Sequence, residues 1–274
     1  MKNALALLLM LMFALAACSG AQAVRSFSKG EEYAAYAFAE SGTFEEGIYS
    51  GAANLLIEDG AYRIEVLQGD NTLWWGQWGA TYADVIVEAD VQQMTEPNQN
   101  AFGLMCRVRG TVGQPAAADP ELAAILADPT AEATVEATLE ATAEVTADAT
   151  AVATAEATTE PEVLPADPRN EGDGYLFLIQ GGGQFSIMRA RGRNLMPLVN
   201  WTASDAIKQG MQTNTLRAVC VGNYLAFYVN GTFVGEATDD TYRDGQVGLA
   251  ASAADRLGTI IQFDNLTVSQ PVAG

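Results

Sequence analysis

The sequence predicts an all-β protein built as a two-sheet antiparallel sandwich. Short apolar segments recur from about residue 47 onward, and Gly, Asp and Asn cluster between them. About a dozen such segments separated by turns favour two packed sheets over a mixed fold. Alternation of apolar and polar residues is clearest over 84–92, and it predicts one buried face formed by Val85, Val87, Ala89 and Val91.

Two dipeptides predict tight hairpin turns. Asp59-Gly60 separates strands expected at 54–58 and 62–67, and Asn230-Gly231 separates strands expected at 224–229 and 232–237. Both central residues of such a turn have positive φ, which these residue pairs tolerate. The other segments in this pattern are strands at 72–77, 83–94, 101–109, 174–180, 184–190, 213–221, 246–251 and 259–268, and a short helix at Ser204–Gln209.

The N-terminus has the pattern of a bacterial lipoprotein signal. Lys2 precedes an apolar run over 4–13, which is too short to span a bilayer, and Leu15-Ala16-Ala17 leads to Cys18. This arrangement resembles the lipobox and implies removal of residues 1–17 and lipidation of Cys18. We therefore expect attachment to the extracytoplasmic face of the bacterial cell membrane. The alternative is an ordinary secretory signal with a chance cysteine.

Residues 115–171 differ from the rest of the chain. They contain 13 acidic residues and one basic residue, lack aromatic residues, and carry threonine at every fourth position from Thr130 to Thr158. Such a segment has little to bury, so we expect a disordered insert, with a transient helix as the alternative. The remaining boundaries are a linker or start of the mature chain at 18–45, a first sandwich part at 46–114 and a second at 172–270.

Cysteine and charge counts restrict the chemistry. With Cys18 lipidated, Cys106 and Cys220 remain as a pair outside the cytoplasm, which favours a disulfide over two buried thiols. The net charge of −20 with no basic stripe argues against nucleic acid as a partner. The chain has no histidine, so it can form neither a Ser-His-Asp nor a Cys-His catalytic arrangement.

Several motifs in the second half carry a family resemblance. Gly174-Tyr-Leu-Phe-Leu-Ile is followed by Asn214-Thr-Leu-Arg-Ala-Val-Cys-Val, by Asn230-Gly231, by Tyr242-Arg-Asp-Gly-Gln-Val-Gly-Leu and by Phe263-Asp-Asn-Leu-Thr-Val. This order resembles the concanavalin A-like jelly roll, in particular its laminin-G-like and 3-keto-disaccharide hydrolase-type domains. The motifs describe structure, and the resemblance does not by itself assign a function.

The candidate catalytic residues are two carboxylates. Glu88 and Asp90 share one strand face, and two carboxyl groups suffice for glycoside hydrolysis. They resemble the Glu-x-Asp-x-x-Glu motif of laminarinase-type enzymes, but the third acid is replaced by Gln93. The alternative is a solvated polar face.

Aromatic residues supply the candidate ligand-binding site. Sugar rings stack on indole faces, while amide side chains bind their hydroxyls. Adjacent residues of a strand point to opposite faces, so Trp74 and Trp75 cannot both be exposed. We select Trp75 with Gln77, and Trp201 with Asn200, as ligand-binding candidates.

A structural Ca²⁺ is the one cofactor that the sequence suggests. Asp239, Asp240 and Asp244 cluster in a turn-rich stretch, and hard carboxylate oxygens suit calcium. The alternative is surface acidity in an acidic protein.

Together these features predict a membrane-anchored lipoprotein with a non-catalytic jelly-roll module that binds a carbohydrate or a cell-envelope protein. A glycoside-cleaving enzyme of the 3-keto-disaccharide hydrolase type is the first alternative. A structural envelope lipoprotein is the second.

Overall fold

The computed structural model describes residues 25–49, 51–69, 71–96, 99–110, 173–191, 194–254 and 257–274. The expected signal peptide, Cys18 and the insert at 115–171 lie outside the described residues. No helix in the described part of the chain is long and apolar enough to cross a membrane.

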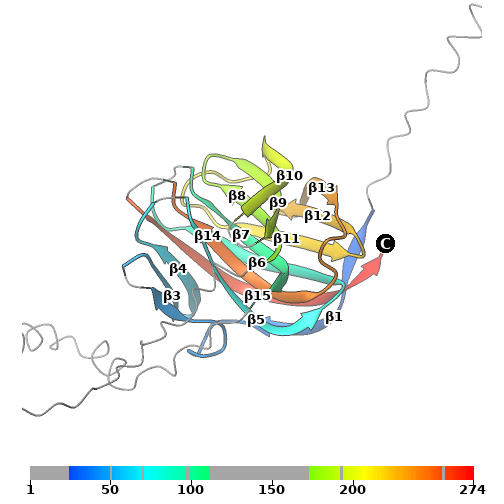
Figure 1. The fold of residues 1–274 in the computed structure, drawn as a ribbon, viewed down its shortest axis with the longest axis horizontal. Helices are drawn as coiled ribbons and strands as arrows, with labels where there is room; N and C mark the ends of the chain where they lie inside the picture. Colours follow the sequence, from blue (N-terminus) through cyan, green and yellow to red (C-terminus); the bar gives the residue numbers. More distant parts are fainter. Residues whose placement is uncertain are drawn as a thin grey trace, which may run out of the picture. The chain divides into compact units, whose positions relative to one another are not determined.

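All regular elements among these residues are β-strands (Figure 1). Their bounds are β1 Phe27–Tyr36, β2 Gly47–Tyr49, β3 Ala53–Glu58, β4 Ala61–Val66, β5 Leu73–Tyr82, β6 Val85–Gln93, β7 Ala101–Arg109, β8 Asp173–Gln180, β9 Gln184–Arg191, β10 Asn194–Ala203, β11 Asn214–Val221, β12 Tyr224–Val229, β13 Thr232–Thr238, β14 Gly245–Ser252 and β15 Thr259–Ala273.

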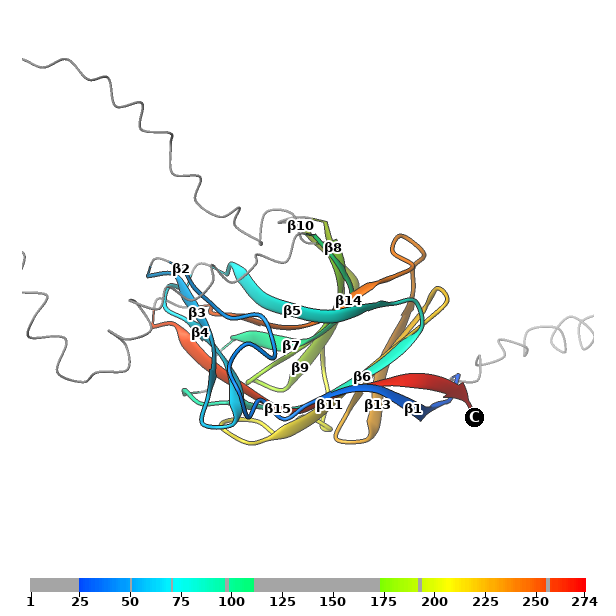
Figure 2. The ribbon, with the colours of Figure 1, turned by 90° about the horizontal axis from the view of Figure 1, so that it is seen from below.

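The strands form two sheets, as the sequence predicts. Sheet A has nine strands in the order β13-β12-β11-β6-β15-β4-β3-β2, with β1 also pairing with β15. Sheet B has six strands in the order β10-β9-β8-β7-β14-β5. Figure 2 shows the sheets as two facing layers, with β5 and β14 in the upper layer and β11 and β15 in the lower.

Residues 25–28 and 272–274 belong to a small unit of their own, in which the Gly274 N–H donates to the Ser26 carbonyl over 3.0 Å. The other described residues, from Lys29 to Pro271, form the sandwich.

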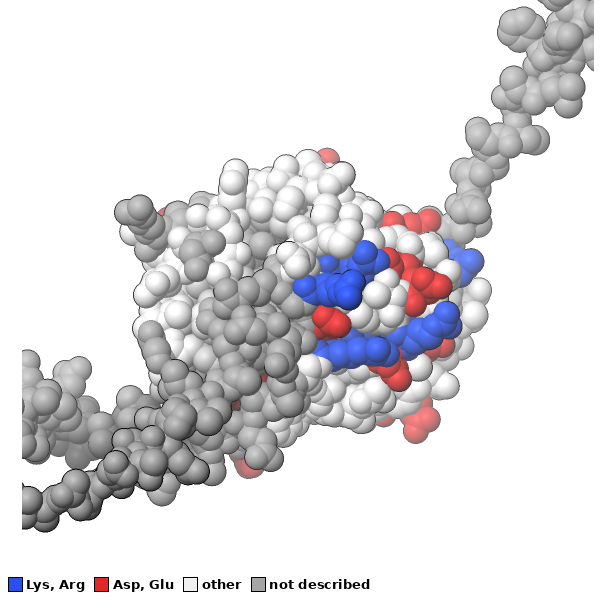
Figure 3. All heavy atoms as spheres, in the orientation of Figure 1, with Lys and Arg blue, Asp and Glu red and all other residues white. Residues whose placement is uncertain are grey.

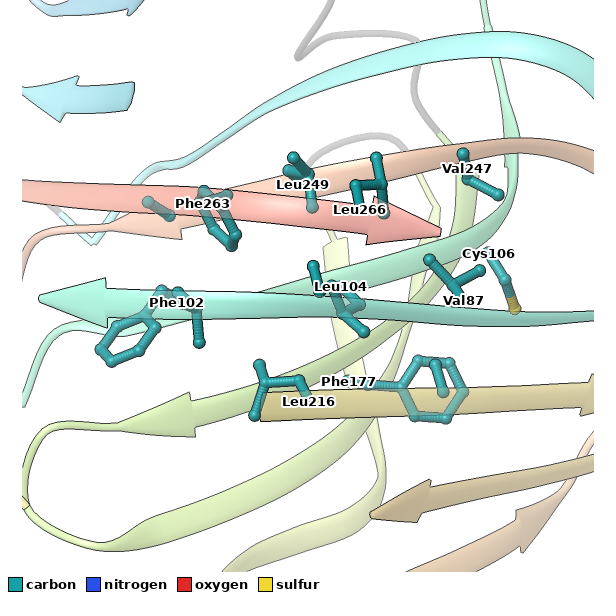
Figure 4. Close-up of a cluster of buried hydrophobic side chains, with 14 of the residues drawn as sticks. Val87, Phe102, Leu104, Cys106, Phe177, Leu216, Val247, Leu249, Phe263 and Leu266 are labelled. Carbon is teal, nitrogen blue, oxygen red and sulfur yellow. The ribbon is translucent and has the colours of Figure 1, made fainter. Parts of the chain in front are cut away.

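The core lies between the sheets and follows the predicted alternation. Val85, Val87, Ala89 and Val91 are at most 1% exposed. They join a cluster that includes Phe102, Leu104 and Phe177 from sheet B and Leu216 and Phe263 from sheet A (Figure 4). Burying a large apolar side chain contributes about 1.5–3 kcal/mol, so this cluster is the main source of stability.

Both predicted tight turns are present. Asp59 and Gly60 have φ of 53° and 76°, and they connect β3 to β4. Asn230 and Gly231 have φ of 51° and 78°, and they connect β12 to β13. Positive φ at both central residues is the conformation that suits the right-handed twist of paired strands.

The predicted disulfide is confirmed. Cys106 lies in β7 of sheet B and Cys220 in β11 of sheet A, both fully buried, so the bond joins the two sheets through the core. It spans 114 residues of sequence. In the chain-entropy picture, closing a loop of about 100 residues stabilises a fold by about 4.7 kcal/mol.

Arg107 forms a second tie between the sheets, beside the disulfide. Its φ of 54° marks a bulge in β7, and its side chain is 1% exposed. The guanidinium donates to the carbonyls of Ala83, Gly222 and Tyr242 over 2.7–2.9 Å. A buried guanidinium group is costly unless hydrogen-bond acceptors such as these carbonyl groups surround it. The three bonds hold three loops against the end of sheet B.

The expected helix at Ser204–Gln209 is wrong, because these residues form turns and loop. The Asn214 amide donates to the Lys208 carbonyl over 2.9 Å, and the Asn230 amide donates to the Ala206 carbonyl over 2.8 Å. These side chains take up backbone groups that a helix would use internally.

Three strands were missing from the sequence prediction: β1, β2 and β10. Strand β1 lies inside the stretch 18–45 that we assigned to a linker or the start of the mature chain. Most of its residues are exposed, as are most of β10, so neither shows a clear apolar alternation. Strand β2 has three residues, too few for a pattern.

The insert is attached at a hairpin. Arg109 at the end of β7 pairs directly with Asp173 at the start of β8. The chain therefore leaves sheet B and returns to it at neighbouring positions, where an ordinary hairpin needs only a few residues.

We predict that a short glycine-rich turn can replace residues 111–172. Loop-closure entropy changes by about 0.6 kcal/mol for each doubling of length, and the replacement shortens the connection by about four doublings. The free energy of unfolding should therefore rise by up to about 2 kcal/mol and should not fall. Urea denaturation of both proteins measures this. A loss of several kcal/mol, with the disulfide intact in both, would show that the segment contributes to the fold.

Candidate functional site

The outer face of sheet B, which points away from the core, is apolar. Because β-strand side chains alternate, each strand that buries residues in the core also places residues on this face. Its buried cluster consists of Leu73, Trp75, Met105, Val108, Leu176, Leu178, Met188, Ala190 and Ala250, with Ala101 and Trp201 packed against it. Met105, Leu176 and Leu178 at its centre are at most 1% exposed. Direct access is thus limited to its margins.

At the β5 margin, Trp75 and Gln77 form a buried amide network. The Trp75 indole N–H donates to Gln77 Oε1 over 3.3 Å, and Gln77 Nε2 donates to Gln246 Oε1 over 2.9 Å. Gln246 Nε2 donates in turn to the Gly79 carbonyl over 2.8 Å. Trp75 is 5% exposed and Gln77 is 2% exposed. The structure therefore brings these two candidates together, but their polar groups bind each other and not solvent.

At the opposite margin, Trp201 and Asn200 lie on β10, the other edge strand of sheet B. Trp201 is partly exposed and packs against the apolar cluster, while Asn200 is exposed. Two register shifts occur where β10 pairs with β9, between Pro197 and Val199 and between Val199 and Thr202. Such bulges bend a strand and redirect its side chains. This pair is the accessible half of the predicted ligand site.

Glu45 is a buried carboxyl group at the β5 margin that sequence reasoning missed. Its Oε2 accepts the Gln77 N–H over 2.8 Å, and its Oε1 is buried without a hydrogen-bond partner. Burial raises the pKa of Glu45 to about 7, against the smaller opposing effect of the Gln77 hydrogen bond. A carboxyl group with this pKa stays protonated in acid and loses its proton only as the pH rises through neutrality.

Glu88 and Asp90 lie on the outer face of sheet A, away from the tryptophans. Glu88 accepts from Lys29 over 2.6 Å and from Arg217 over 2.5 Å. Burial alone would raise the pKa of Glu88, but the hydrogen bonds from Lys29 and then Arg217 outweigh it, so the net shift is downward. Asp90 accepts from Thr215 and Asn265. Both carboxylates are already hydrogen-bonded to side chains on the outer face of sheet A. This arrangement does not favour the catalytic role that the sequence suggests.

The three aspartates expected to hold Ca²⁺ each pair with a different arginine. Asp239 binds Arg189 over 2.7 Å and accepts the Tyr175 hydroxyl over 2.7 Å. Asp240 faces Arg243, and Asp244 faces Arg109. Within the described residues no three acidic, histidine or cysteine side chains gather as a metal site. The donor set does not fit Ca²⁺, because guanidinium groups already occupy the carboxylates.

The charges are also mixed across the visible surface. On the face shown in Figure 3, basic and acidic side chains lie next to each other and form no continuous patch of one sign.

Comparison with solved structures identifies the fold. A protein of unknown function from Bacillus subtilis with a galectin-like fold superposes with a TM-score of 0.53 at 12% identity, covering 91% of this chain and 100% of that one. A glycosidic hydrolase superposes with a TM-score of 0.50 at 8% identity, covering 88% and 97%. The chain has a concanavalin-like jelly-roll fold. Its sequence matches no family model and no curated protein.

The jelly roll separates the predicted site residues into three places. The tryptophans occupy the two margins of one sheet, the carboxylate pair lies on the other sheet, and the aspartates lie near the β13–β14 connection. Glu45 joins the first group only through the fold, because strands β2, β3 and β4 lie between it and β5 along the chain. A buried glutamate has no sequence signal that distinguishes it from a solvated one.

We predict that Glu45→Gln raises stability in a pH-dependent way. The folded-state pKa is about 7 against an ordinary value of 4.5, so the stabilising contribution of the protonated group is complete below about pH 4.5 and lost as the pH rises through 7. Over this pH range the free energy of unfolding of the variant should rise relative to that of the native protein, by up to about 3 kcal/mol at pH 8. Chemical denaturation at several pH values measures the difference.

Glu88→Gln is the matched control with the opposite sign. The pKa of Glu88 is lowered, so its contribution is present near neutral pH and lost as the pH falls. The Glu88→Gln variant should therefore be less stable than the native protein at pH 7 and approach it in acid. A pH-independent difference for Glu45→Gln would contradict the burial argument.

Proposed function

We propose that this chain is an extracytoplasmic lipoprotein whose jelly-roll module binds a glycan without cleaving it. The contact surface is the β10 margin of sheet B, where Trp201 and Asn200 are accessible. The lipid on Cys18 would hold the module at the cell membrane, on its outer side.

The observation that carries this proposal is the partly exposed Trp201, which packs against the apolar outer face of sheet B and follows the exposed Asn200 in the bulged part of β10. An indole offers a large rigid surface for the C–H face of a sugar ring. Asn200 supplies both a donor and an acceptor for ring hydroxyls. Binding sites generally combine an apolar floor with a few such polar groups.

The proposal that the module does not cleave its ligand depends on the hydrogen bonds of the two candidate carboxylates, Glu88 and Asp90. Glycoside hydrolysis requires two carboxyl groups facing the same bond. Glu88 and Asp90 are hydrogen-bonded within sheet A, on the other sheet from Trp201.

A hydrolase is the second candidate, and Glu45 is the observation that favours it. A carboxyl group with a pKa of about 7 has the protonation state that a general acid needs. It contacts the Trp75–Gln77 network through the Gln77 N–H. Loss of glycan cleavage in Glu45→Gln, with Glu88→Gln unaffected, would support an enzyme of the 3-keto-disaccharide hydrolase type. A structural envelope role would instead leave every glycan unbound.

We predict that Trp201→Ala weakens glycan binding by about tenfold, because aromatic stacking and its buried area are lost. A glycan array selects the ligand, and titration calorimetry on the soluble protein measures the affinity. Tyr228→Ala, on the outer face of sheet A, is the control and should bind normally. If the native protein retains no glycan, the proposal fails.

We predict that Cys18→Ser releases the protein from the membrane fraction. A single apolar run of this length does not anchor a mature protein, whereas acyl chains contribute about 0.8 kcal/mol per buried methylene. Fractionation of cells that express each form measures the distribution. Equal membrane retention of both forms would contradict lipidation at Cys18.

A further inference from the structure

Three tyrosines gather where β1 approaches the end of β5. Tyr33 and Tyr36 belong to β1, and Tyr82 is the last residue of β5. The rings of Tyr33 and Tyr82 stack with centroids 5.4 Å apart and an interplanar angle of 15°. Tyr33 is 43% exposed, so this stack reaches the surface and does not simply fill the core.

The hydroxyl groups of Tyr36 and Tyr82 both lie near Gly79. Gly79 is exposed, and a Cβ atom placed there would lie 2.8 Å from Tyr36 Oη and 3.9 Å from Tyr82 Oη. The φ of Gly79 is +84°, which disfavours any larger residue. Among the described residues, none hydrogen-bonds to the hydroxyls of Tyr33 or Tyr36. The Tyr82 hydroxyl, in contrast, already accepts a hydrogen bond from the Ala80 backbone N–H. The hydroxyls of Tyr33 and Tyr36 are therefore the two that a ligand could use.

A small cavity opens beside this cluster. Its volume is about 180 Å³, and it is lined by Tyr36, Phe38, Glu40, Thr43 and three alanines. Pockets for drug-sized ligands measure about 300–1,000 Å³, so this cavity suits a single ring. Glu40 is its one charged lining residue.

We propose that Tyr33, Tyr36 and Tyr82 form a second glycan-contact site that takes a neutral sugar ring. The exposed ring of Tyr33 provides the stacking surface, and the hydroxyls of Tyr33 and Tyr36, with Glu40, provide hydrogen-bond partners for sugar hydroxyls. Among the described residues that line the cavity none is a cation, while Glu40 is an acid, so the site fits a neutral sugar better than an acidic one. The site lies on the β1–β5 side of the sandwich, whereas Trp201 lies on β10, the opposite edge strand of sheet B.

That the ligand of this site is a glycan rests on the proposed function. The test must therefore distinguish binding at the tyrosine site from binding at the β10 margin. Neutral oligosaccharides of glucose, mannose and xylose are titrated into the native protein, Tyr33→Ala, Tyr33→Phe and Trp201→Ala. We expect Tyr33→Ala to weaken binding by roughly three- to tenfold, Tyr33→Phe to fall between it and the native protein, and the control Tyr228→Ala to bind normally. Because Tyr33 is exposed, these variants should fold, which thermal denaturation checks.

If Trp201→Ala weakens binding and Tyr33→Ala does not, the tyrosine site is overturned and the proposed function stands. If Tyr33→Ala weakens binding and Trp201→Ala does not, the tyrosine site is supported and the β10 surface is wrong. Aromatic clusters also bind proline-rich peptides, so a polyproline peptide is titrated in parallel. Binding of that peptide alone, lost in Tyr33→Ala, would overturn the sugar assignment.

Discussion

The covalent bond between Cys106 and Cys220 is the constraint on which the sandwich depends. It joins the middle strands of both sheets, and each sheet contains strands from before and after the insert. Strands β7 and β8 border the insert and still pair directly. Arg107 reinforces the same end through three carbonyl groups. The fold is thus held by contacts between the two halves, and the continuity of the chain between them contributes little.

The two sheets use their outer faces differently. Sheet A presents ion pairs and amides, such as Glu88 with Lys29 and Arg217. Sheet B is apolar on both faces, so its strands read as nearly continuous hydrophobic runs. An apolar outer face costs solubility unless it is covered or used. In the proposed function, recognition falls to two places: the β10 margin of sheet B with Trp201, and the β1–β5 side with Tyr33.

Local patterns predicted most of the fold, and long-range contacts account for what they missed. The Asn-Gly turn and the alternation in β6 depend on neighbouring residues only. The disulfide was predicted from the two cysteines that remain, out of three, when Cys18 is assigned to lipidation. The loop at 204–209 is instead set by Asn214 and Asn230, which lie further along the chain. Strand alternation correctly predicted that Trp74 and Trp75 face opposite sides of sheet B. It could not show that both would be buried, or that Gln77 would accept the Trp75 indole N–H. No sequence pattern identifies Glu45, because its pKa is raised by burial and not by its residue type.

Backbone and side-chain NMR of the soluble protein, titrated with the glycan selected by array, tests the central claim most directly. If the jelly roll binds through the β10 margin and the β1–β5 side, the indole N–H of Trp201 and the ring signals of Tyr33 and Tyr82 should shift, while residues around Glu88 on the outer face of sheet A stay unchanged. Shifts confined to the Glu88 surface, or no shift with any glycan, would contradict the account.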